Sequence, residues 1–155
     1  MKRIILLTLL CTTTILMAQR INHIQEAIAD YDYETALILI AKEKTTIPLL
    51  LQKGKAQRGL GLNAEALSTY QEIIANDTAN TRAYIEAAEC CRSLAKNQQA
   101  LKYYEQALDL NPENKYVRIQ YIGLLLSLQK FQEALGESSL MTEKELSLIH
   151  ISETT

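Results

Sequence analysis

The stretch "NQQALKYYEQALDLNPENKY", residues 97–116, decides the fold. Apolar or small residues stand at positions 100, 101, 104, 107 and 108, which is the spacing of one face of an α-helix. Asn111-Pro112 predicts the end of this helix, because proline lacks an amide donor and restricts the residue before it. The stretch therefore predicts an amphipathic helix followed by a turn.

The same pattern recurs at a fixed interval along the chain. Its first alanine, Ala100, has counterparts at Ala66 and Ala134, and the two steps are equal in length. A further copy around Ala36 precedes Ala66 by a slightly shorter step, which indicates a shortened unit. Equal steps of this size predict repeated helix hairpins, each leaving an apolar flank for the next to cover.

A 34-residue period with alanine at this point resembles the tetratricopeptide repeat. The likeness covers nearly all of the chain after the N-terminal segment and is best over residues 81–114. In that copy the residues at the family's signature positions are Tyr84, Ala88, Ala100, Tyr104, Ala107 and Pro112. The resemblance implies an all-α fold, an α-solenoid of antiparallel helix hairpins with about three to four repeats.

The other copies match the family less completely. Residues 19–46 form a degenerate first hairpin. Residues 47–80 carry Leu50, Gly54, Ala66, Tyr70 and Ile73, with Thr78 in place of the proline. Residues 115–145 keep Phe131 and Ala134, but Ile122, Ser138 and Met141 stand where small, aromatic and small residues are usual.

Packing explains the small residues at these positions. Helices whose axes lie about 8–10 Å apart need small side chains at the crossing, which Ala88 and Ala100 provide. Tyr104 is expected to fill the space beside the crossing. Gly59 and Gly61 weaken the helical pattern where the turn of the preceding hairpin is expected.

The first 18 residues have the plan of a signal peptide. Two positive charges at residues 2 and 3 precede an apolar run over residues 4–17, and the small Ala18 follows. The run is short for a membrane-spanning helix, which needs about 20 residues. A lipoprotein signal with lipid on Cys11 fits poorly, because Leu10 stands where a small residue is required. The sequence predicts export to the periplasm or cell envelope, or secretion.

Composition narrows the classes of function. Apolar residues make up 48% and charged residues 22%, which is typical of a folded chain. The net charge of −2 gives no reason to expect a nucleic acid partner. Cys90 and Cys91 are interpreted as small apolar residues packed in a helix. A redox or intermolecular role for them stays open.

Catalytic motifs are not found in the sequence. His23, the one histidine before the C-terminal tail, lies where Ile21, Ile24, Ile28 and Tyr31 have helical spacing, and it is interpreted as a helix-surface residue. No Cys/His spacing for zinc, glycine-rich phosphate loop or nucleophile elbow is present. We therefore expect no enzyme, no cofactor and no metal site.

The resemblance implies that the first helix of each hairpin lines a concave binding groove. The residues at its inward positions are Leu51, Lys55, Arg58, Arg82, Ile85, Glu89, Arg92, Tyr116, Ile119 and Leu126. This mixed apolar and basic set predicts a protein or peptide partner with apolar anchors and acidic character. That the charges only form a solvated face stays an open alternative. The family's clamp for a terminal carboxylate is not supplied by Leu51/Lys55 or Ile85/Glu89.

The C-terminal tail, residues 146–155, is predicted not to be native. Its "LSLIHISE" looks like the translation of a sequencing adapter. The alternative is a frayed final helix whose apolar residues cap the exposed flank, and His150 is given no role in either case. Two functions follow: an exported interaction scaffold, or the accessory repeat region of a longer envelope protein.

Overall fold

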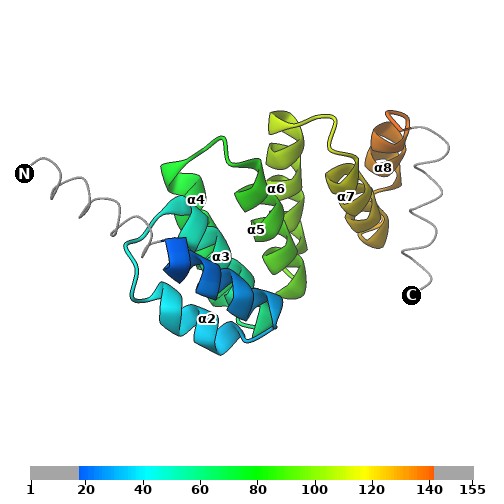
Figure 1. Ribbon diagram of the computed structural model, residues 1–155. Helices are drawn as coiled ribbons and strands as arrows, with labels where there is room; N and C mark the ends of the chain where they lie inside the picture. Colours follow the sequence, from blue (N-terminus) through cyan, green and yellow to red (C-terminus); the bar gives the residue numbers. More distant parts are fainter. Residues whose placement is uncertain (1–17, 142–155) are drawn as a thin grey trace, which may run out of the picture. The chain divides into compact units, whose positions relative to one another are not determined.

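The computed structural model describes residues 18–141. The predicted signal peptide up to residue 17 and the predicted non-native tail lie outside the described residues. Within them the chain is helical without strands. A helix over residues 18–29 precedes those labelled in Figure 1. The labelled helices are α2 (Tyr33–Ile40), α3 (Ile47–Gly59), α4 (Asn63–Asn76), α5 (Thr81–Ser93), α6 (Asn97–Leu110), α7 (Lys115–Ser127) and α8 (Phe131–Ser138).

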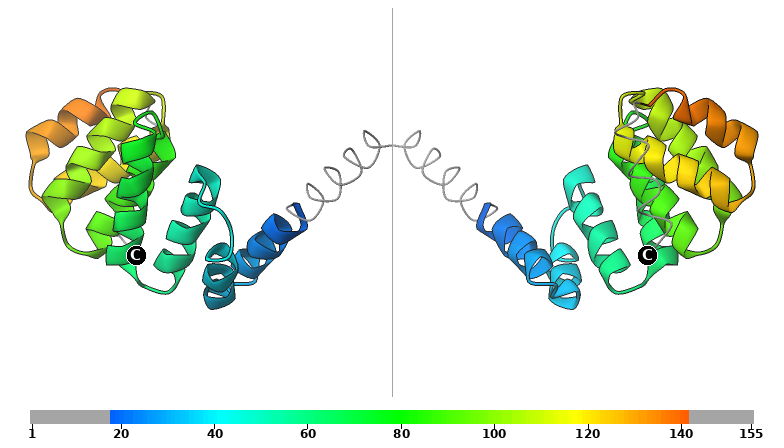
Figure 2. Two further views of the ribbon diagram at one scale, coloured as in Figure 1. Left: turned by 90° about the vertical axis from the view of Figure 1, so that its left-hand side faces the viewer. Right: turned by 90° about the vertical axis from the view of Figure 1, so that its right-hand side faces the viewer.

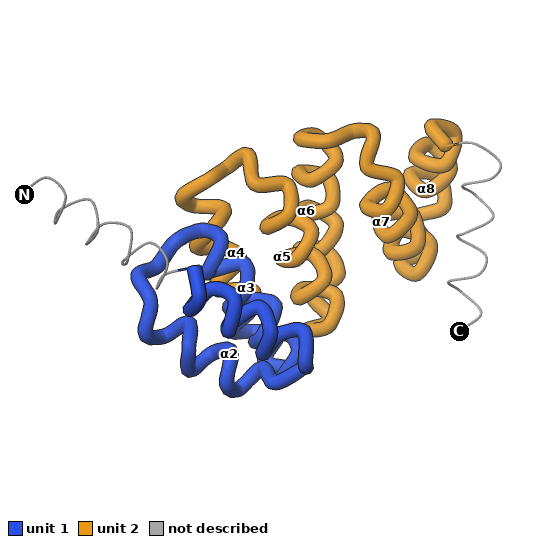
Figure 3. Tube along the Cα trace, viewed as in Figure 1, with its two compact units in different colours: residues 1–66 blue, residues 67–155 orange. Residues whose placement is uncertain are grey.

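The chain divides into two compact units, residues 1–66 and 67–155 (Figure 3). In the first unit, α2 packs against α3, and the helix over residues 18–29 contributes Ile24 and Ile28 to the shared core. Ala36, Ile40 and Ala56 complete that core. Burial of these apolar side chains stabilises the unit.

The first helix buries the middle of its expected apolar stripe but not the two ends. Ile21 is 42% exposed and Tyr31 is 78% exposed, whereas Ile24 and Ile28 are buried. Tyr31 leaves the stripe because it adopts a left-handed backbone conformation after the helix has ended. His23 is exposed on the helix surface, as expected.

In the second unit, helices that follow one another in sequence pack side by side. Contacts join α5 to α6, α6 to α7 and α7 to α8, and Figures 1 and 2 show this succession from three directions. Ala88, Ala100 and Tyr104 have no exposed surface, so the small residues and the tyrosine pack as expected. Cys90 and Cys91 are fully buried, as two small apolar residues would be.

Each of α3, α5 and α7 begins at a side chain that caps it. The side chains of Thr46, Asn80 and Asn114 accept hydrogen bonds from the backbone N–H three residues later. Such a bond satisfies one of the amide donors that a helix N-terminus leaves without a partner. The caps recur at the same interval as the alanines, so the period governs helix starts as well as packing.

The turn that follows the first helix has the same geometry in four hairpins. Tyr31, Gly61, Ala95 and Gln129 have φ between 55° and 75°. In each turn the next residue donates its N–H to the carbonyl five residues earlier, for example Lys96 to Cys91. This is the Schellman ending of a helix, which favours glycine at the left-handed position. Only one of the four turns, at Gly61, has a glycine at this position.

None of the helices in the described part of the chain combines the length and apolarity needed to cross a membrane.

Candidate functional site

The residues predicted to line a groove lie on α3, α5 and α7. Leu51, Lys55 and Arg58 belong to α3 in the first unit, and the remaining seven belong to α5 and α7 in the second. None of the ten is buried. Lys55, Arg82, Arg92 and Tyr116 are exposed, whereas Leu51, Arg58, Ile85, Glu89, Ile119 and Leu126 are half-buried.

A hydrogen-bonded network brings α5, α6 and α7 together. Nη1 of Arg92 donates to Oε1 of Gln120 over 2.7 Å and, more weakly, to the hydroxyl of Tyr104 over 3.4 Å. That hydroxyl donates to Oε1 of Glu89 over 2.6 Å. Oε2 of Glu89 lies 3.6 Å from Nη1 of Arg92. The network fixes the Arg92 guanidinium beside α7.

This network involves two of the residues predicted to line the groove. Glu89 and Arg92 pair with each other and with the buried Tyr104. Helical position predicts which face a residue occupies, and it does not predict where a long side chain ends. Sequence reasoning also missed Gln120, whose only signal is its position one residue after Ile119.

The Tyr104 hydroxyl stays protonated because of its surroundings. Burial of the ring raises the pKa of Tyr104 well above its usual range, and the bond to the Glu89 carboxylate raises it further. Burial and the carboxylate of Glu105 raise the pKa of Tyr121 in the same way. Both hydroxyls therefore remain donors throughout the neutral range.

We expect these two tyrosines to make the fold sensitive to alkali. In the unfolded chain a tyrosine ionises near pH 10, whereas the folded protein holds both as phenols. Stability is therefore unaffected below about pH 10 and falls as pH rises toward the folded pKa values. Thermal unfolding between pH 8 and 11 should show a smaller loss of stability above pH 10 in Tyr104→Phe than in the parent. A parallel loss in both proteins would contradict this linkage.

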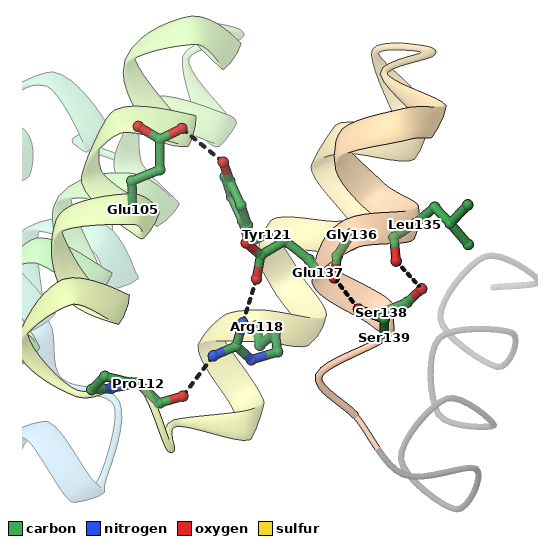
Figure 4. Close-up of polar contacts among 9 residues, drawn as sticks. All are labelled: Glu105, Pro112, Arg118, Tyr121, Leu135, Gly136, Glu137, Ser138 and Ser139. Carbon is green, nitrogen blue, oxygen red and sulfur yellow. Dashed lines mark hydrogen bonds and ion pairs between the residues drawn. The ribbon is translucent and has the colours of Figure 1, made fainter.

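A second group of polar contacts in the second unit does not involve the residues predicted to line the groove (Figure 4). Arg118 of α7 pairs with Glu137 of α8 and donates from Nη2 to the Pro112 carbonyl over 2.7 Å. The hydroxyl of Tyr121 donates to Oε1 of Glu105 over 2.7 Å. These bonds tie α7 to α6, to α8 and to the turn before it, so they position α7.

The first unit contains an apolar cavity that the sequence did not predict. It has a volume of about 230 Å³ and lies between the helix over residues 18–29 and the start of α3. Ile21, Ile24, Pro48 and Leu49 provide most of its apolar lining. It is smaller than the roughly 300–1,000 Å³ of small-molecule sites, and its size suits one side chain.

A metal centre is not among the features of residues 18–141. Within that range no three His, Cys, Asp or Glu side chains are placed to hold a metal ion together.

The helix hairpins recur at a fixed interval. Their first helices α3, α5 and α7 are capped at the start and carry the residues predicted to line the groove. This arrangement defines a helical-repeat protein. Two family models, both described as tetratricopeptide repeat, match residues 51–114 and 93–137. Together they extend over more than half of the chain. The chain belongs to the tetratricopeptide repeat family, and its fold is an all-α solenoid of helical repeats.

Solved structures support the fold. A tetratricopeptide repeat protein from Parabacteroides merdae is similar with a TM-score of 0.76 at 21% identity, over 86% of this chain and 57% of that one. The chain thus spans little more than half of that relative's length. The first TPR of Spaghetti (RPAP3), bound to HSP90 peptide SRMEEVD, gives 0.66 at 21% identity, over 70% and 89% of the two chains.

A third structure is that of PcrH in complex with the chaperone binding region of PopB. Its TM-score is 0.61 at 19% identity, over 70% of this chain and 93% of that one. No curated protein matches the chain in sequence.

Proposed function

We propose that this chain is an exported, non-catalytic scaffold that holds a peptide or protein partner on its first helices. The observation that carries the proposal is the outer face of α5 and α7. Both helices bury one face, yet Ile85 on α5 and Tyr116 and Ile119 on α7 keep exposed surface. Apolar residues left partly exposed beside charged ones favour a binding surface.

Two related structures support a peptide as the kind of partner. Spaghetti was solved with an HSP90 peptide, and PcrH was solved with a region of PopB. Both share this fold over 70% of the chain. The proposal carries that mode of binding over to α5 and α7 of this protein.

The charges refine the proposed partner. Arg82 is exposed on α5, while the charge of Arg92 is partly balanced by Glu89 at 3.6 Å. The surface is therefore less basic than a count of its arginines indicates. We propose a partner that binds mainly through apolar anchors and carries a small number of acidic groups.

Export is proposed from the first 18 residues. Their basic start, apolar run and small Ala18 are the parts of a secretory signal. The partner is accordingly proposed to reside in the cell envelope or outside the cell.

A photo-crosslinking experiment tests the scaffold. A benzophenone side chain is placed at Ile119 on α7, or at the exposed Gln106 of α6 as a matched control, in the full-length chain produced in its source cells. We expect discrete crosslinked species from Ile119 and none from Gln106, recovered from the envelope or the medium. Equal crosslinking from both positions, or none from either, would overturn the proposed surface. Species found only in the cytoplasm would overturn export.

An accessory repeat region within a longer envelope protein is the second proposal. The share of the Parabacteroides merdae relative that this chain covers, 57%, is the observation that favours it. The DNA that follows the codon of Leu146 separates the two: a long open frame supports the second proposal, and an early stop codon supports the first.

A further inference from the structure

The guanidinium of Arg92 is anchored through one nitrogen only. Its contacts with Gln120, Tyr104 and Glu89 all involve Nη1. Among residues 18–141, Nε and Nη2 therefore have no partner. The side chain is 39% exposed, so this second edge is accessible. The two N–H groups of such an edge match the two oxygens of a carboxylate.

Gln120 presents a second unused donor at the same place. An arginine can only donate, so Oε1 of Gln120 must face Arg92 and the amide NH₂ must face elsewhere. That NH₂ group makes no hydrogen bond within the described part of the chain. Arg92 thus orients Gln120, and Gln120 orients Arg92.

Open space adjoins these donors. Gly123 lies three residues after Gln120 and therefore on the same face of α7. A Cβ placed on Gly123 would meet nothing within 4 Å. On the other side, Tyr116 lies one turn before Gln120, is 56% exposed, and is close enough to interact with the Arg92 charge. The surface on the Gly123 side of Gln120 is therefore open, and the exposed ring of Tyr116 borders the other side.

Glu89 does not block the site. One of its oxygens accepts from Tyr104, and the other faces Nη1 of Arg92. It lowers the net positive charge without contacting Nε or Nη2. Recognition there depends on the paired donors more than on net charge, and it fixes the register of a partner more than its affinity.

We propose that the Nε–Nη2 edge of Arg92 and the amide of Gln120 form a receptor for one aspartate or glutamate side chain of a partner peptide. The choice of a side chain over a chain end follows from the open surface beside Gly123, where a peptide has room to continue. That the bound carboxylate belongs to a biological partner rests on the proposed scaffold function. The receptor itself rests only on the contacts among α5, α6 and α7.

Three short peptides test the receptor by NMR. The probes are Ac-Ala-Glu-Ala-amide, the neutral Ac-Ala-Gln-Ala-amide, and Ac-Ala-Gln-Ala with a free terminal carboxylate. We expect the first to shift the Arg92 Nε–H and Gln120 NH₂ signals saturably, with a Kd at least tenfold below those of the other two. Equal binding of the neutral peptide would overturn the receptor. Tighter binding of the free terminal carboxylate would overturn the side-chain assignment.

Gln120→Glu is the decisive variant. Its carboxylate can still accept from Nη1 of Arg92, so the helix contact is kept, but the added charge repels a second carboxylate. We expect at least tenfold weaker binding of the glutamate peptide. Gln132→Glu places the same charge on exposed α8 and should change the Kd less than twofold. Unchanged binding by Gln120→Glu would overturn the receptor.

The two proposals fail separately. Loss of the NMR response with crosslinking retained at Ile119 removes the receptor and leaves the scaffold. A normal NMR response without crosslinking at Ile119 keeps the receptor and removes the scaffold function.

Discussion

Replacing Tyr104 with alanine is expected to lower the free energy of unfolding by about 3–5 kcal/mol, the range for truncating a large buried aromatic side chain. Tyr104 has no exposed surface and lies in the middle of α6, between helices that pack on both sides of it. Its removal leaves a cavity and also takes the hydroxyl from Glu89. Urea unfolding followed by circular dichroism measures the loss.

Two companion variants isolate the cause. Tyr104→Phe keeps the ring and removes only the hydroxyl, so we expect a loss of about 1 kcal/mol. Tyr116→Ala removes the same type of side chain from an exposed position and should cost no more than about 0.5 kcal/mol. If Tyr104→Ala were no more destabilising than Tyr116→Ala, the packing described for α6 would be wrong.

Gly59→Ala is the second substitution with a large expected effect, and the first unit should lose about 1–3 kcal/mol. A Cβ added at Gly59 would collide with the aromatic ring of Tyr33 at the start of α2. The two helices that form this unit would then have to separate or the ring would have to move. Chemical unfolding of the variant measures the cost.

The same exchange has the opposite sign at Gly123. That glycine lies inside α7 with open space around it, so alanine should stabilise the helix by about 0.5–1 kcal/mol. A double-mutant cycle with Tyr33→Ala locates the clash: the cost of Gly59→Ala should largely disappear once the ring is absent. A cost that persists without the ring would rule out the contact with Tyr33 as its cause.

The repeat could be predicted from the sequence because the geometry of closely crossing helices requires small residues at the crossing. Ala66, Ala100 and Ala134 are all buried, at the regular spacing that identified them. The helix-capping residues at the same spacing, such as Asn80 and Asn114, were equally readable and were missed. Their signal is a polar residue just before each apolar stripe.

The site was less predictable because it depends on the ends of long side chains. Position on α5 indicated that Glu89 and Arg92 avoid the core, and they do. Their hydrogen bonds to Tyr104 and Gln120 come from two other helices, and no local pattern in the sequence encodes such partners. Tyr31 shows the same limit on a smaller scale: its apolar character fits the helical stripe, but the backbone turns before it.

The shared turn geometry gives successive repeats matching ends. Ala95 and Gln129 hold the left-handed conformation at the same point of successive hairpins, and Asn80 and Asn114 start the helices that precede them. A segment cut from one cap to the next therefore begins and ends in the same backbone conformation. A tandem duplication of residues 81–114 therefore preserves the backbone conformation at both junctions. The length of the repeat array is then set by copy number, which is open to recombination and to design.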